Sequence, residues 1–472
     1  MRINADEIRS NVDQVRRLLQ EETTLSPILR TALEMLLLVV TILLNRVGLN
    51  SRNSSKPPSA DQYRKKPPRN SNGNKPGGQK GHRGSNLEPV GDPDEIVILK
   101  VDSSTLLQGN YREDGFESRQ VFDVDISVCV TEYRAQVLVD QQGKRWVAPF
   151  PQDVSATVQY GSSVKAGAVY MSQHQLLPYN RVEEQFADMF QIPLSAASVF
   201  NFNQDAFNRL EQFERWVKEQ LLVTPVLHAD ETGINIGSKG HWLHSLSNDR
   251  LTLFHVHANR GGKAMDDMGV LPLFKGILCH DHWSPYFKYN VTHAMCNAHH
   301  LRELEWAAEQ EKQLWAKTLQ ALLKEASHAK NLSTGCPDQQ TGQIFRERYR
   351  KILADAETEC PPPNENDRNG KRGRLKRSKS RNLLERLREH EHGVLLFLEN
   401  PDVPFSNNQA ENDIRMTKVH QKISGCFRSQ NGAAIFCRVR SFLSTCRKNG
   451  VSATQALKDL FQGKWPDFIT PP

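Results

Sequence analysis

The feature that most constrains the fold is a strand-like stretch with two acids in its middle, LHADETGINIG at residues 227–237. Apolar residues lie on both sides of Asp230 and Glu231, so this stretch is expected to be largely buried. An ionised carboxylate is costly to bury without a positive partner. The strand therefore either opens to solvent or meets something positive at the acids, and a metal ion is one candidate.

The segments that follow residue 223 predict an α/β domain. Three strand-like runs, PVLHADETGINI, HWLHSLSN and LTLFHVHAN, precede a short helical stretch, GKAMDDMGVLPLF, and a fourth strand, GILCHDH. Three strands, a helix and a strand is the order expected of a ribonuclease-H-like sheet. We place this domain at residues 223–430, with a helical insertion at about 310–398 and a helical segment at 431–472.

The N-terminal part of the chain is predicted to be helical and then basic. Helical spacing over residues 1–50 is interrupted at Ser26 and Pro27, which predicts a helical hairpin or a coiled coil. It either mediates oligomerisation or packs within one chain. Residues 51–92 are rich in Ser, Asn, Pro, Gly and Lys, and this composition predicts a disordered basic linker.

Two further modules are predicted between the linker and the sheet domain. Residues 93–155 alternate between apolar and polar side chains, which predicts a small β module. Residues 156–222 return to helical spacing, with a break at QIPLS after which Ser195 can cap a new helix. A helix, a short turn and a helix are compatible with a helix-turn-helix DNA reader, and equally with a plain packing unit.

Positive charge is concentrated in two segments. Residues 52–83 hold nine basic residues against Asp61 alone, and residues 368–381 hold eight and no acid. Each segment carries +8, so with a total of +7 the remainder of the chain sums to −9. This distribution indicates a polyanionic partner, nucleic acid first, and two solvated charge runs are the plainer alternative. The candidate DNA contacts in the first segment are Arg64, Lys65, Lys66, Arg69, Lys80 and Arg83.

The cysteine pattern and the length of the apolar runs indicate a cytosolic protein. Eight cysteines are scattered without a CxxC pair, which is typical of reduced thiols in a cytosol. The longest apolar run, Met35 to Leu44, is far short of the ~20 residues that span a bilayer. No signal-peptide pattern follows Met1. A cytoplasmic, nucleoid-associated protein without a membrane partner is expected.

Three carboxylates are candidates for one metal site. Asp281 lies near the end of the fourth strand, 51 residues after Asp230. If the two strands are neighbours, both side chains reach one edge of the sheet, where their repulsion would raise a pKa unless a divalent cation neutralised it. Oxygen-only ligands favour Mg²⁺ or Mn²⁺ over Zn²⁺. The third candidate is Glu411, in an early turn of a helix that Ser406 or Asn407 can cap.

Two cations follow Glu411 along the same helix face. Arg415 lies four residues after it and Lys418 seven residues after it. An acid followed by two bases along one face can hold a metal at one end and reach phosphates beyond it. For an isolated helix, an ordinary ion pair between Glu411 and Arg415 is the simpler interpretation.

Four sequence blocks resemble the catalytic blocks of the IS-sixty-six family of insertion-sequence transposases: HADETG, HDHWSPY, CNAHHLREL and NNQAENDIRMTKVHQKISGCFRS. Upstream, NSSKPPS and KPGGQKGHRG resemble that family's basic linker. The resemblance implies a DDE triad of Asp230, Asp281 and Glu411 on a ribonuclease-H-like domain, with two Mg²⁺ or Mn²⁺ ions. It implies cleavage of double-stranded DNA at the element ends and transfer of the freed strand into target DNA.

The resemblance also implies partners and supporting residues. The cations of the last block would contact DNA phosphates: Arg415, Lys418, Lys422 and Arg428. A C-x₂-H step, Cys296 and His299, would support the triad. A homo-oligomer and accessory proteins of the same element are expected. The family often carries a cysteine-rich module after the linker, but residues 85–160 here contain only Cys129, so a zinc-stabilised finger is not expected.

Other acids and ligand sets are interpreted as structural. Glu231 would point to the opposite face of a regular strand from Asp230. Asp266 and Asp267 are expected on a solvated helix face. Zinc held by Cys279, His280, Cys296 and His299 is the less favoured alternative, because the first two residues are adjacent on a strand.

Competing functions remain open at this point. A DNA-binding protein that has kept the fold and lost catalysis is one alternative, and a nuclease that cuts without joining is another. No GxSxG elbow frames a nucleophilic serine, and no Walker A loop or dinucleotide fingerprint is present.

Overall fold

The computed structural model describes residues 5–22, 24–47, 49–50, 52–54, 61, 87–124, 126–151, 153–333, 335–364, 375 and 377–470. The chain divides into two units, residues 65–131 and the remainder. The predicted DNA contacts of the basic linker, from Arg64 to Arg83, lie outside the described residues.

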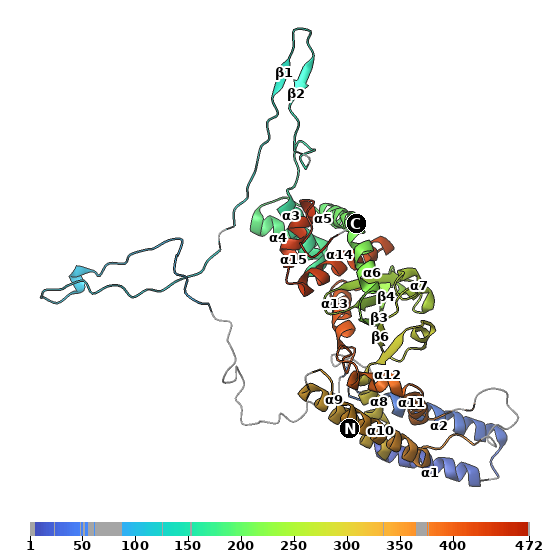
Figure 1. Ribbon diagram of the computed structural model, residues 1–472. Coiled ribbons are helices and arrows are strands. Elements are labelled where there is room, and N and C mark those ends of the chain that lie inside the picture. The colour runs from blue at the N-terminus through green and yellow to red at the C-terminus, as the bar shows by residue number, and fades with distance from the viewer. Residues whose placement is uncertain are drawn as a thin grey trace. The chain divides into compact units, whose positions relative to one another are not determined.

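A mixed five-stranded sheet forms the centre of the C-terminal two thirds of the chain (Figure 1). Its strands are β3 (Val226–Ile236), β4 (Lys239–Ser247), β5 (Thr252–His257), β6 (Ile277–His280) and β7 (Thr292–Met295). Their spatial order is β5-β4-β3-β6-β7. β3, β4 and β5 pair antiparallel, whereas β3, β6 and β7 are parallel. The α/β class is therefore confirmed, and β7 is a strand that the sequence did not predict.

Helices cover the sheet and its edge. α7 (Gly262–Met268) connects β5 to β6, and α13 (Asn408–Ser424) lies alongside β3 and β4 (Figure 1). α14 (Gln430–Lys448) packs along β5 and is followed by α15 (Ala453–Phe461). The Phe254 N–H donates to Ser441 Oγ at 2.8 Å, so α14 satisfies part of the exposed backbone of this edge strand.

A bundle of shorter helices precedes the sheet. It consists of α3 (Ser162–Val169), a π-helical turn (Tyr170–His174), α4 (Tyr179–Phe190), α5 (Ala196–Arg209) and α6 (Glu211–Leu222). These helices share one apolar core with α14 and α15, built from residues such as Val169, Val182, Leu210, Phe213 and Phe442. The Ser195 side chain accepts from the Ser198 N–H at 3.1 Å, as the predicted cap requires. DNA reading by the pair α4 and α5 stays a prediction.

A second helical group lies between β7 and α13. Its members are α8 (Asn297–Gln310), α9 (Leu314–Leu332), α10 (Gln339–Glu359), α11 (Lys379–Glu389) and α12 (Glu391–Leu395). They enclose a separate apolar core that includes Leu319, Leu323, Tyr349 and Leu384, together with Ala294 and Met295 of β7. The group is therefore anchored on the sheet at β7.

The second basic segment is partly internal to this helical group. Arg381 is buried and forms ion pairs with Glu357 and Glu385. Arg377 also pairs with Glu385. The interpretation of this segment as a run of solvated or phosphate-binding charges is thus wrong for Arg377 and Arg381, because acids from neighbouring helices neutralise them.

The N-terminal residues form a helical hairpin, one of the two arrangements that the helical spacing predicts. α1 (Ala5–Glu21) contacts α2 (Pro27–Val47), and Val12, Leu19 and Leu44 are buried. Most other apolar side chains of α2 are exposed. By length and composition alone, Pro27–Leu44 is apolar enough to cross a membrane, so the apolar stretch is longer than Met35 to Leu44 indicates.

The alternating segment forms strands only at its C-terminal end. Between residues 87 and 151, strands are assigned in the described part to β1 (Val137–Val139) and β2 (Arg145–Val147), which pair antiparallel. Large apolar side chains before them are exposed, including Ile96, Leu99, Val121 and Val130. Alternation requires a partner surface to bury one face, and the described residues of this segment provide none.

Candidate active site

Asp230 and Asp281 lie at the same edge of the sheet because their strands are parallel neighbours. β6 pairs with β3 as far as His228, and Asp230 follows two residues later. Asp281 comes directly after β6. The carboxyl ends of parallel strands form the usual site for ligands in such sheets. The Asp281 carboxylate accepts a hydrogen bond from the Trp283 N–H at 3.1 Å, and that of Asp230 accepts one from the Glu231 N–H at 2.9 Å.

Glu411 reaches this edge from the first turn of α13. The first turn of a helix favours a carboxylate, because the backbone N–H groups there give it a partial positive charge. Asn407 precedes the helix and its backbone begins the first turn, but its side chain does not cap. Instead, its amide N–H donates to the Ala229 carbonyl at 2.8 Å, and its oxygen lies 2.8 Å from His228 Nδ1. The buried Asn407 thereby attaches the start of α13 to β3, one residue before Asp230.

The three acids interact electrostatically. Burial raises the pKa of Asp230 to about 8, and repulsion from Glu231, Asp281 and Glu411 adds to the rise. The pKa of Glu231 is also raised, first by burial and then by Asp281. Without a counter-ion, Asp230 therefore holds a proton at neutral pH. A divalent cation bound here would favour the charged carboxylates and so offset the rise in pKa, which makes this edge of the sheet suitable for one.

The Glu411 side chain has nitrogen groups around it but forms no hydrogen bond with them in the part of the chain that the structure describes. One buried oxygen, Oε1, lacks a hydrogen-bond partner among the described residues. Arg302 lies 3.6 Å from that oxygen and His299 Nδ1 lies 3.8 Å from it. Burial and the charge of Arg302 lower the pKa of His299, which favours the neutral ring. A buried carboxylate oxygen without a donor is a ready ligand for a cation.

One compact group of donor atoms includes Glu411. The donor atoms of Cys296, His299 and Glu411 all lie within 4.8 Å of one another. Burial raises the pKa of the Cys296 thiol, and its sulfur accepts a hydrogen bond from the Asn407 N–H at 3.1 Å. The sulfur therefore contacts the residue that positions α13. The four-residue zinc set considered from the sequence does not form, because His280 lies against His293 with 3.0 Å between their ring nitrogens.

Asp230, Asp281 and Glu411, all within the described chain, do not make a group of this compactness. One ion bound by all three would require their oxygens to close in. Two ions about 3.5–4 Å apart require less, because each ion needs only part of the carboxylate set. The donor chemistry, oxygen atoms only, fits Mg²⁺ or Mn²⁺.

Glu231 is paired with Arg260 and Tyr286. Its side chain is 1% exposed and accepts hydrogen bonds from Arg260 at 2.6 Å and from the Tyr286 hydroxyl at 2.6 Å. The Arg260 guanidinium lies over the rings of Trp242 and Trp283 at 4.7 Å and 4.1 Å. The structural interpretation of Glu231 therefore agrees with its contacts. No sequence pattern points to Arg260, which lies 29 residues away in a loop.

Replacing Arg260 by Ala should lower the free energy of unfolding by about 2–3 kcal/mol. The change leaves a buried carboxylate with one donor, and the partial exposure of Arg260 keeps the loss below that of a fully buried pair. Chemical denaturation measures the loss of stability. The double variant Arg260→Ala/Glu231→Gln should recover part of that loss. Arg250→Ala, on an exposed turn, is the control. Equal stability of Arg260→Ala and the unaltered protein would contradict this assignment.

The predicted phosphate contacts differ in their surroundings. Arg415, Lys422 and Arg428 are exposed. Lys418 is also exposed and donates to the Gly233 carbonyl of β3 at 2.8 Å, so contact with a phosphate through its other N–H groups stays a prediction. Asp266 and Asp267 are not simply solvated, because Asp266 pairs with Lys288 and Asp267 lies 3.0 Å from His257 Nε2.

Comparison of the sequence with known proteins finds two family matches and a relative. Residues 157–435, more than half of the chain, match the model of the Transposase IS66 family, and residues 1–88 match a family of unknown function (DUF6444). An uncharacterized protein, y4jO of Sinorhizobium fredii, is 36% identical over 77 residues, which are 16% of this chain and 24% of that protein. The chain thus spans about a quarter of that relative's length.

The first of these matches identifies the class of protein as the transposases. The chain belongs to the Transposase IS66 family.

Proposed function

We propose that this protein is a metal-dependent DNA transposase that cleaves phosphodiesters at the ends of an insertion sequence and joins the freed strands to target DNA. The observation that carries the proposal is the electrostatic coupling of Asp230 to Asp281 and Glu411, which come from β3, from the end of β6 and from α13. Burial and the adjacent Glu231 raise the pKa of Asp230 most, and acids as many as 181 residues away in the chain add to the rise at a single edge of the sheet.

The sheet order supports a ribonuclease-H-like catalytic domain. Three antiparallel strands followed by two parallel ones, in the order β5-β4-β3-β6-β7, put β3 at the centre of the sheet. The acid of β3 and the acid after β6 then become neighbours across one strand spacing. The group from α8 to α12 fits the role of an insertion between β7 and the helix that bears Glu411.

The residues of the site suit phosphoryl transfer. Asp230, Asp281 and Glu411 would hold two Mg²⁺ or Mn²⁺ ions, which when bound stabilise charge on the attacking and leaving oxygens. Asn407 holds α13 against β3 and so fixes the distance of Glu411 from Asp230. Arg415, Lys418, Lys422 and Arg428 would contact phosphates along the DNA. A water molecule attacks first, and the freed 3′-hydroxyl then attacks target DNA in a second in-line transfer.

A strand-transfer assay tests the proposal. The purified protein is incubated with DNA carrying the element's ends and with a target plasmid, with Mg²⁺ or with EDTA. Joined products that depend on Mg²⁺ are expected. Cleavage without joining would favour a nuclease, and binding without either reaction would favour a DNA-binding protein that has lost catalysis. Accessory proteins of the same element belong in a parallel reaction, because the family resemblance implies them.

A further inference from the structure

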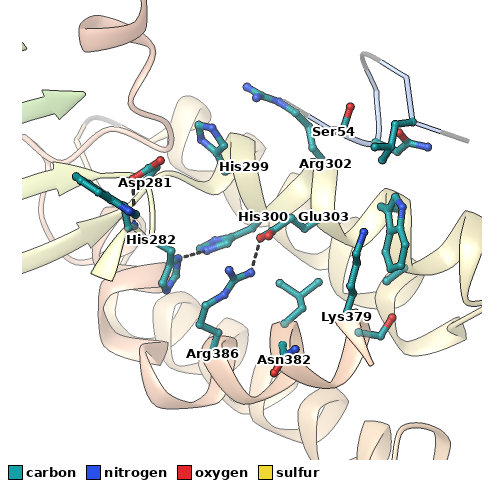
Figure 2. A pocket seen from close by; sticks show the side chains of 17 residues that line it. Ser54, Asp281, His282, His299, His300, Arg302, Glu303, Lys379, Asn382 and Arg386 are labelled. Atoms are coloured by element: carbon teal, nitrogen blue, oxygen red, sulfur yellow. Dashed lines mark hydrogen bonds and ion pairs between the residues drawn. The ribbon is translucent and has the colours of Figure 1, made fainter. Parts of the chain in front are cut away.

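A cavity of about 550 Å³ opens directly beside Asp281. Its walls come from α8, α11, the segment that follows β6, and Leu49, Asn53 and Ser54 after α2. Figure 2 shows Asp281 at one end and Lys379 toward the other. This volume lies within the range of about 300–1,000 Å³ that is typical of sites for small molecules. The cavity suits a single nucleotide rather than a duplex.

Three cations line the cavity, and they differ in how firmly they are paired. Arg386 forms an ion pair with Glu303 at 2.6 Å. Arg302 lies 3.6 Å from Glu411, a loose contact. Lys379 is exposed and forms no ion pair with a described residue. Lys379 and Arg302 are therefore the cations that can bind an added phosphate with the least loss of existing contacts.

Aromatic rings form part of the same walls. Trp283 lies at the Asp281 end, and Trp306 lies near Lys379. The Lys379 ammonium lies 4.5 Å from the centre of the Trp306 ring and covers that face. Because Lys379 is long and exposed, it can turn toward a phosphate and uncover the indole. Bases stack on such rings without sequence preference.

We propose that this cavity receives one unpaired nucleotide of the DNA strand held at Asp281, with its base against Trp306 and its phosphate at Lys379 and Arg302. The inference rests on the proposed function for the identity of the strand. A base inside a duplex cannot enter a pocket that admits one nucleotide, so enzymes that use such pockets take the nucleotide out of the stack. The nucleotide would hold the strand in register beside the acids.

Binding measurements without catalysis test this inference. The full chain is titrated in EDTA with three probes: a twelve-nucleotide thymidylate strand, an abasic strand of the same length and charge, and free thymidine monophosphate. The thymidylate strand should bind about 5- to 150-fold more tightly than the abasic strand, the range for loss of one stacked base. Free thymidine monophosphate binding as tightly as the strand would overturn the assignment to DNA.

Variants separate stacking from charge. Trp306→Ala should bring the ratio of the two strand affinities close to one, Trp306→Phe should retain most of it, and Lys379→Ala should weaken both strands alike. Trp146→Ala is the matched control, because Lys144 lies 4.3 Å over that exposed ring outside the cavity. An unchanged ratio in Trp306→Ala, or an equal fall in Trp146→Ala, would overturn the proposal.

Photo-crosslinking provides a readout on the unaltered chain, because Trp306 packs in the core of its helical group and its replacement by Ala can impair folding. A strand with one 5-iododeoxyuridine should crosslink to peptides containing Trp283 or Trp306. Crosslinks found only outside the cavity would refute the assignment of the nucleotide to this cavity. If the protein crosslinks at this cavity but fails the strand-transfer assay, the cavity binds a nucleotide and the proposed function is wrong. If the protein joins DNA without this crosslink, the proposed function holds and the nucleotide site is wrong.

Discussion

Asp230→Asn should lower DNA cleavage and strand transfer by at least about a thousandfold, equivalent to about 4 kcal/mol of transition-state stabilisation. Asn preserves the shape of the side chain, but it removes the negative charge and replaces one carboxylate oxygen by an NH₂ group that cannot bind a metal ion. Because the predicted phosphate contacts lie on other residues, DNA affinity should change by no more than about twofold. Cleavage is measured on end-labelled DNA in Mg²⁺, and affinity is measured on the same DNA in EDTA.

The matched control is Asp267→Asn, which makes the same chemical change on α7, where the acid is 49% exposed and lies beside His257. This variant should cleave at the normal rate. If Asp230→Asn retained cleavage, Asp230 would not be a ligand. If both variants lost it equally, the effect would reflect the loss of an acid in general and not the site.

The apparent affinity for Mg²⁺ should rise about tenfold for each pH unit from about pH 5 to 8, and should level off above that. The pKa of Asp230 is raised from 3.8 to about 8, so the metal-free site holds a proton over this interval. Binding of an ion displaces that proton, and one displaced proton gives a tenfold change per pH unit. Isothermal titration of the full chain with MgCl₂ across this pH range measures the slope.

The same pKa predicts how the metal-free protein responds to pH. A carboxyl whose pKa is higher in the folded than in the unfolded state stabilises the fold below about pH 4 and loses that contribution as the pH rises through 8. In EDTA, the melting temperature should therefore fall as the pH rises from 4 to 8. Added Mg²⁺ should raise the melting temperature most at pH 8. Asp230→Asn should flatten both dependences. A Mg²⁺ affinity that does not vary with pH would contradict the coupling of the proton and the ion.

Much of the sheet could be predicted because its signals are local. β3, β4 and β5 have apolar periodicity over six or more residues, and the acids mark where β3 and β6 reach the edge. Each of these features needs only neighbouring residues to be recognised. β7 was missed because its four residues, THAM, carry too little pattern to distinguish a strand.

The contacts that position the site could not be predicted, because they depend on tertiary structure. Asn407 looks like a helix cap in sequence, but its amide bonds to Ala229, 178 residues away. Arg260 and Arg381 look like solvated charges, and only the fold brings Glu231 and Glu357 against them. Alternation over residues 93–155 indicated strands but gave no partner surface. Local patterns therefore predicted the elements, whereas packing decided which polar groups meet.

Anomalous diffraction from crystals soaked in MnCl₂ tests the central claim most directly. Manganese is expected on the carboxylate oxygens of Asp230, Asp281 and Glu411, and the ions should be lost in Asp230→Asn. Manganese found solely at Cys296, His299 and Glu411, with Asp230 and Asp281 unliganded, would contradict it.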